Sequence, residues 1–166
     1  RTLIAPAALW NTTIAAIEQS PLYHHLRMRP QLGLIPLGPD PGSGLFEFAH
    51  LQSGTVPARD PGTGKLQLGD DSAIVLVLLP EALTTLGCET TASTDGHPAN
   101  IDPAAVASEG PSYQIRLDPF FVAKHETTQA QWIRHTGRNP SNYTKDSEIH
   151  GPAITGSNPV EQMDWS

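Results

Sequence analysis

The sequence predicts a loop-rich α+β fold, and three observations carry this prediction. The 166 residues include 16 prolines and 14 glycines, well above an average combined share of about 12%. The apolar fraction of 38% is too high for a disordered chain. Short apolar segments with the features of strands are interspersed with two helical segments. The length suits one domain of ordinary size.

The first predicted element is a helix over Ala7–Gln19. Trp10, Ile14 and Ile17 recur in it at the spacing of one helical face. A proline directly after Ser20 ends it. We therefore expect an amphipathic helix at the start of the chain.

Extended segments are predicted for the next part of the chain. The Pro/Gly-rich stretch Pro30–Gly44 is expected to be an ordered connector, because four apolar residues would anchor it against a neighbour. Leu45–Leu51 is predicted to be a short strand, Arg59–Gly64 a turn, and Lys65–Leu68 the returning arm of a hairpin. Ala73–Leu79 is an almost unbroken β-branched and leucine run, which predicts a central strand buried on both faces. No internal repeat is recognised.

The second half is predicted to contain a long loop, two strands and a helix. Gly87–Pro111 has little bulky apolar content and is expected to be a loop, which at this length is usually functional or mobile. Tyr113–Leu117 alternates as a half-buried strand does, and Phe120–Val122 continues as an extended apolar segment.

The helix over Gln129–Thr136 has recognisable start and stop signals. Thr128 and Gln131 have the spacing of a capping box, and Gly137 can adopt the left-handed conformation that ends a helix. Trp132-Ile133 is expected to supply its apolar contacts.

Composition excludes several classes of protein. The net charge is −7 with a pI of about 5.4, and no cluster of basic residues is present, so nucleic acid and anionic lipid surfaces are not expected partners. Cys88 is the only cysteine, which excludes an intrachain disulfide and a multi-cysteine zinc site. No apolar run reaches the ~18 residues of a membrane span.

The residues that invite a functional interpretation are better explained structurally. Cys88 has an acidic neighbour, Glu89, which disfavours the thiolate, and Trp132 and Trp165 are expected to be core residues. Glycine-containing Gly42–Gly44 and Gly62–Gly64 lack the Gly-Lys-Ser/Thr ending of phosphate loops. The histidines lack the spacing of metal ligands; they are His24, His25, His50, His97, His125, His135 and His150. The acidic residues of the loops lack the spacing of a calcium-binding loop; they are Asp70, Asp71, Asp95, Asp102 and Glu109.

The chain resembles a known family in two segments. They are LDPFFVAKHETTQAQW at Leu117–Trp132 and NPVEQMDW at Asn158–Trp165. It resembles the formylglycine-generating enzyme-like, or sulfatase-modifying-factor, family. The matching positions, in order along the chain, are Ile74–Leu79 with Pro80, Gly87, Glu109 to Pro111, Phe120-Phe121, Lys124, Glu126, Thr128, Gln131-Trp132, Asn139 to Ser141, Pro159-Val160, Met163 and Trp165.

The resemblance also has departures. Pro80–Gly87 lacks two glycines that the family has in its first turn, His125 replaces a tyrosine, and Asp164 replaces a serine at a helix cap. The lost glycines indicate either drift in a tolerant part of the fold or a domain no longer selected for catalysis.

The resemblance implies a C-type-lectin-like fold that is incomplete at the C-terminus. Residues 1–70 would be a linker or accessory segment with one helix and a short hairpin, and residues 71–166 the N-terminal part of the domain. Because Arg1 opens the chain without Met and the chain stops where a helix is expected after Asp164, we expect a fragment. Cut from its remaining strands, such a fragment would aggregate readily.

Two functions follow from the resemblance. Active members oxidise a cysteine of a client sulfatase with copper held by two cysteines, and relatives are iron-dependent sulfoxide synthases. The parent would then be an oxidase of protein or thiol substrates, with its catalytic residues, copper pair and calcium ligands beyond Ser166 and none in residues 1–166. The remainder of its own domain would be a partner.

The alternative function is a non-catalytic, lectin-like binding or regulatory module. The stretch Pro30–Leu51 resembles the region before this domain in large bacterial multidomain proteins, where a serine/threonine protein kinase often lies upstream. The sequence leaves the compartment open, with the cytoplasm favoured, because any targeting segment could precede Arg1.

Overall fold

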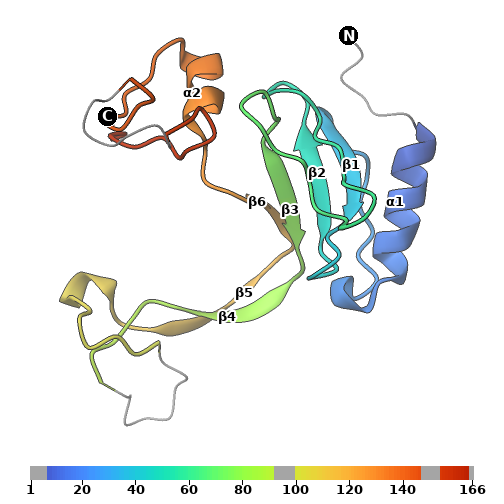
Figure 1. Cartoon of the computed structure of the whole chain (residues 1–166). Coiled ribbons are helices and arrows are strands. Elements are labelled where there is room, and N and C mark those ends of the chain that lie inside the picture. The colour runs from blue at the N-terminus through green and yellow to red at the C-terminus, as the bar shows by residue number, and fades with distance from the viewer. Residues whose placement is uncertain (1–6, 92–99, 147–153, 165–166) are drawn as a thin grey trace. The chain divides into compact units, whose positions relative to one another are not determined.

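The computed structural model describes residues 7–91, 100–146 and 154–164 and shows a small mixed α+β fold (Figure 1). Those residues form two α-helices and two sheets. The chain divides into two compact units, the first comprising Arg1–Leu79 and Phe121–Ser166 and the second Pro80–Phe120. The α+β class expected from the sequence is confirmed.

The first unit is built on a four-stranded sheet in the order β1-β2-β3-β6. Its strands are β1 (Leu34–Pro39), β2 (Phe46–His50), β3 (Val75–Leu79) and β6 (Phe120–Ala123). β2 pairs antiparallel with β1 and with β3. The strands predicted for β2, β3 and β6 are confirmed, and β3 lies inside the sheet as expected.

β1 corrects the connector expected over Pro30–Gly44. Its register with β2 shifts between Pro36 and Gly38, and it lies at an edge of the sheet, where proline is tolerated because one side of the strand needs no ladder hydrogen bonds. The hairpin arm expected over Lys65–Leu68 is reduced to an isolated bridge between Arg59 and Leu66. The domain boundary after residue 70 stays a prediction, and the sheet combines strands from both sides of it.

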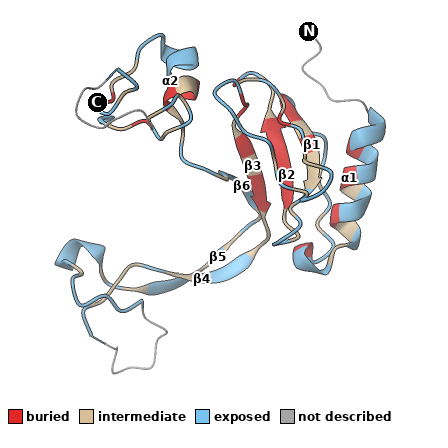
Figure 2. Cartoon of the chain, in the orientation of Figure 1, coloured by how far each residue is buried: buried red, intermediate tan, exposed pale blue. Residues whose placement is uncertain are grey.

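A helix covers this sheet and completes its core. Helix α1 spans Ala7–Gln19, as predicted, and the Trp10 ring stacks on Phe48 with centroids 5.6 Å apart. Phe48 also meets Phe121 edge-to-face at 5.1 Å. The short 3₁₀ helix η1 (Pro21–Tyr23) follows. The Tyr23 hydroxyl donates to the Leu78 carbonyl at 2.8 Å and accepts from a β2 amide. Figure 2 shows the buried residues concentrated on β2, β3 and the inner side of α1.

Helix α2 (Gln129–Thr136) has the ends that the sequence predicts. The Thr128 side chain accepts from the Gln131 amide, the Gln131 side chain returns to the Thr128 amide, and Gly137 closes the helix at φ 78°. The expected apolar contacts are wrong in part, because Ile133 is 42% exposed. The buried residues of α2 are instead Gln129 and Gln131.

The second unit is a two-stranded sheet with a partly irregular loop. β4 (Ala82–Leu86) pairs antiparallel with β5 (Tyr113–Leu117), and η2 (Ala107–Glu109) lies in the described part of the predicted loop. β5 was predicted, whereas β4 was not. Gly87 closes β4 at φ 81°, and a Cβ there would lie 2.6 Å from the Pro111 carbonyl oxygen, so glycine is required.

The two described α-helices have 13 and 8 residues. None of them within residues 7–91, 100–146 and 154–164 is long and apolar enough to cross a bilayer. This agrees with the absence of a span in the sequence.

The cap of α2 gives a first testable expectation. Thr128→Ala removes the acceptor of the Gln131 amide and should lower the free energy of unfolding by about 1 kcal/mol. Thr12→Ala is the matched control, because Thr12 is exposed inside α1 and bonds only to the preceding turn, where alanine is the better helix former. Chemical denaturation of both variants compares them, and an equal loss in T12A would contradict the role of the cap.

The edge strand β6 gives a second testable expectation, about self-association. The opposite edge, β1, carries two prolines and an irregular register, whereas β6 has neither proline nor charge and its Val122 is 41% exposed. An unprotected edge favours intermolecular pairing, so Val122→Lys should reduce self-association measured by sedimentation and light scattering. Val106→Lys, at a valine 60% exposed and outside any strand, should leave self-association unchanged. Equal improvement in both would point to net charge alone.

Candidate ligand pocket

Two turns of the first unit have the same sequence pattern and the same hydrogen bonds. In Asp40–Gly44 the Asp40 Oδ2 accepts from the amides of residues 42 and 43 at 3.1 and 2.9 Å, and from the Ser43 hydroxyl at 3.0 Å. In Asp60–Gly64 the Asp60 Oδ1 accepts from the equivalent donors at 3.0, 2.7 and 3.0 Å. Asp-Pro-Gly-Ser/Thr-Gly is thus a short internal repeat, which corrects the expectation that none exists. Because these amides already donate to a carboxylate, they are not free for a phosphate.

A buried carboxylate connects both turns to the sheet. Glu47 on β2 is 0% exposed and accepts from Arg59 at 2.5 Å and from Lys124, the residue that follows β6. Lys124 also pairs with Asp40 at 2.9 Å. A buried charge is tolerated when it is paired and hydrogen-bonded. We call Asp40, Glu47, Arg59 and Lys124 the charge cluster.

Arg59 fixes the second turn within this cluster. Its guanidinium donates to the carbonyls of Leu37, Gly64 and Gly38 at 3.0, 2.9 and 3.3 Å. The planar guanidinium has five N–H donors, which suits it to a site with several acceptors. One side chain therefore joins β1, β2 and the turn.

Contacts within the charge cluster shift the pKa values of Asp40 and Lys124. The hydrogen bond from Lys124, followed by those from Ser43, holds the pKa of the Asp40 carboxyl well below its usual range. Burial alone would lower the pKa of Lys124, but its bonds to Glu47 and Asp40 outweigh burial and raise the pKa. Asp60 lies outside the charge cluster, and its pKa is lowered by the Thr63 amide, the Thr63 hydroxyl and the Gly62 amide. Lys124 is therefore a cation and Asp40 an anion at neutral pH.

The start of α2 holds two distant loops in place. Gln129 Nε2 donates to the carbonyls of Tyr143 at 2.7 Å and Pro159 at 3.4 Å. Gln131 Nε2 donates to the Ser72 carbonyl at 3.2 Å. Arg134 donates to the Asp70 carbonyl at 2.7 Å. The two buried glutamines of α2 thus hold the chain before β3 and the segment around Pro159.

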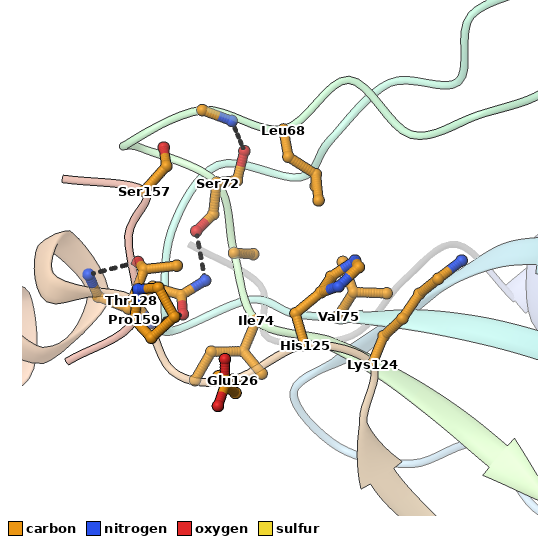
Figure 3. Close-up of a pocket in the computed structure, with 13 residues that line it drawn as sticks. Leu68, Ser72, Ile74, Val75, Lys124, His125, Glu126, Thr128, Ser157 and Pro159 are labelled. Atoms are coloured by element: carbon orange, nitrogen blue, oxygen red, sulfur yellow. Dashed lines mark hydrogen bonds between the residues drawn. The ribbon is translucent and has the colours of Figure 1, made fainter. Parts of the chain in front are cut away.

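These contacts enclose a pocket of about 600 Å³ (Figure 3). It lies between the start of β3, the segment after β6 and the loop before Val160. Figure 3 shows His125, Val75 and Lys124 on one side and Thr128 and Pro159 on the other. Its lining residues are Leu68, Gly69, Ser72, Ala73, Ile74, Val75, Lys124, His125, Glu126, Thr128, Gln131, Ser157 and Pro159.

Most polar groups of this lining are already bonded. Ser72 Oγ accepts from the Gly69 amide at 2.8 Å, and Ser157 Oγ donates to Asp70 at 2.7 Å. His125 and Glu126 differ, because both are exposed and neither has a hydrogen bond or ion pair to another described residue. An imidazole and a carboxylate are thus free to meet a ligand.

Outside this pocket, the candidate residues that the structure describes do not come together in a second site. Cys88 is half-buried in the second unit, with Sγ 3.4 Å from the Asn100 carbonyl oxygen. No group of three His, Cys, Asp or Glu side chains suited to a metal occurs within the described ranges. Asp95, His97, His150 and Trp165 lie outside them. Trp132 is half-buried, with a buried indole nitrogen that has no partner among the described residues.

Sequence reasoning missed the charge cluster and the pocket. A signal was available in the cluster, since Glu47 interrupts the apolar strand LFEFAHL and the two Asp-Pro-Gly turns repeat. Comparison of the chain with protein-family models, with curated proteins and with solved structures found no match. The pocket is therefore interpreted from its chemistry.

The two turns provide a matched test of the cluster. Asp40→Asn keeps an oxygen acceptor for its turn but removes the charge that pairs with Lys124, so it should destabilise the protein by about 1 kcal/mol at neutral pH. Asp60→Asn makes the same change in the turn whose carboxylate is held by Thr63 and Gly62, and should cost less.

The pH dependence follows from the lowered pKa of Asp40. A carboxyl whose pKa is depressed by folding stabilises the protein above its unfolded pKa and loses this contribution as pH falls through the folded value. The gap between wild type and D40N should therefore narrow below about pH 4, the ordinary pKa of aspartate. Urea unfolding across pH measures this, and a loss in D60N as large as in D40N would contradict the role of Lys124.

Proposed function

We propose that this chain is the N-terminal part of a formylglycine-generating enzyme-like domain whose described residues act as a binding module. The ordered matches from Ile74 to Met163 support the family, as does the position of the paired Phe120-Phe121 on a strand that precedes a capped helix. A C-type-lectin-like scaffold with variable loops suits binding, although a fold alone does not define a function.

One observation carries the binding role. Lys124 and Gln131, which match the family's signature, both bind other parts of the chain. Lys124 pairs with Glu47 in the charge cluster, and Gln131 donates to the Ser72 carbonyl before β3. His125 and Glu126, which lie between them, have their polar groups free at a pocket. His125 stands where the family has a tyrosine. The pocket surface therefore differs from that of the family, while the contacts of Lys124 and Gln131 hold the scaffold.

Oxidase chemistry would require residues from elsewhere in the parent protein. Cys88 is the only cysteine of this chain, so the residues present do not fit a copper ion held by two cysteines. The oxidase of protein or thiol substrates is therefore the competing proposal. A module attached to a serine/threonine protein kinase is compatible with the binding role.

A copper-dependent oxygen-uptake assay separates the two proposals. The gene product, read through to its stop codon, is supplied with copper(I) and a cysteine-containing peptide. A binding module should show no copper-dependent uptake above that of a heat-denatured sample. Uptake that persists in Cys88→Ala, together with a cysteine pair downstream, would overturn the binding role and establish the oxidase.

A further inference from the structure

The pocket lining carries one uncompensated charge. In the charge cluster, the carboxylates of Asp40 and Glu47 balance the two cations. Arg59 forms an ion pair with Glu47, and Lys124 forms ion pairs with both carboxylates. Lys124 lines the pocket, but its charge is already paired with Asp40 and Glu47. Glu126 remains as the charged side chain of the lining that has no partner among the described residues.

The rest of the lining adds an apolar surface and one adaptable polar group. Leu68, Ile74, Val75 and Pro159 contribute aliphatic walls. His125 can donate or accept a hydrogen bond through its two ring nitrogens. The volume of about 600 Å³ is in the range of pockets that hold small organic ligands.

We infer that this pocket takes an organic cation with an apolar body, an amine or a guanidinium. This inference rests on the proposed binding function and names its ligand class. The cationic group meets the Glu126 carboxylate, the apolar body lies against Ile74 and Val75, and His125 supplies a second polar contact. The same chemistry occurs in an Arg or Lys side chain of a peptide and in a free hydrophobic amine.

Pairs of probes that are similar in size but differ in charge test the inference on the whole ¹⁵N-labelled chain. The peptide pair is N-acetyl-Leu-Arg-amide and its uncharged citrulline analogue. The free-amine pair is phenethylamine and 2-phenylethanol. The charged member of at least one pair should shift the amide resonances of Ile74, Val75 and Glu126. It should bind up to about fivefold more tightly than its neutral counterpart, the upper end of the range for an exposed ion pair. The pair with the larger charge preference identifies the source of the cation.

Two variants that remove one negative charge complete the test. Glu126→Gln should abolish the preference for the charged probe. Asp118→Asn should leave the preference intact, because Asp118 is an exposed carboxylate outside the pocket lining. Equal binding of charged and neutral probes, no shifts at the pocket amides, or an equal loss in D118N would overturn the inference. The oxygen-uptake assay does not involve Glu126, so it decides the proposed function separately.

Discussion

The first unit depends on the pairing of one buried carboxylate. Glu47 lies on β2, in the middle of the sheet, where its side chain is fully enclosed. Leaving such a charge unpaired would cost several kcal/mol, so the fold must bring Arg59 and Lys124 to it. This requirement fixes the second Asp-Pro-Gly turn against β1 through the carbonyl contacts of Arg59. It also fixes the segment after β6 through Lys124.

Buried polar side chains play a similar part around α2. Apolar packing holds α1 to the sheet, with Trp10 and Ile17 enclosed. α2 instead buries Gln129 and Gln131, and their amide groups bond to backbone carbonyls of loops. Hydrogen bonds of this kind specify position more narrowly than apolar contact does, because each amide needs a partner when it is buried. The pocket walls are therefore held by directional contacts.

The sequence predicted features that depend on neighbouring residues and missed those that depend on distant ones. α1 was found from its periodicity and α2 from its capping box, and both signals lie within a few residues. β1 was missed because its prolines argue against a strand until its place at a sheet edge is known. β4 was missed because ALTTL lacks a strong apolar alternation, and its pairing with β5 supplies the ladder. The contact of Lys124 with Glu47 spans 77 residues, and no local pattern encodes it.

The position of the second unit in the chain has a consequence for how this protein can vary. The chain leaves the first sheet at the end of β3 and re-enters it at β6, and these two strands are neighbours in that sheet. Residues 80–119 therefore form an excursion whose two ends are anchored in neighbouring strands. The entropic cost of closing such a loop grows only slowly with its length. Lengthening, shortening or exchanging this excursion thus leaves the scaffold's strand order intact, which makes it the natural place for related chains to diverge in size.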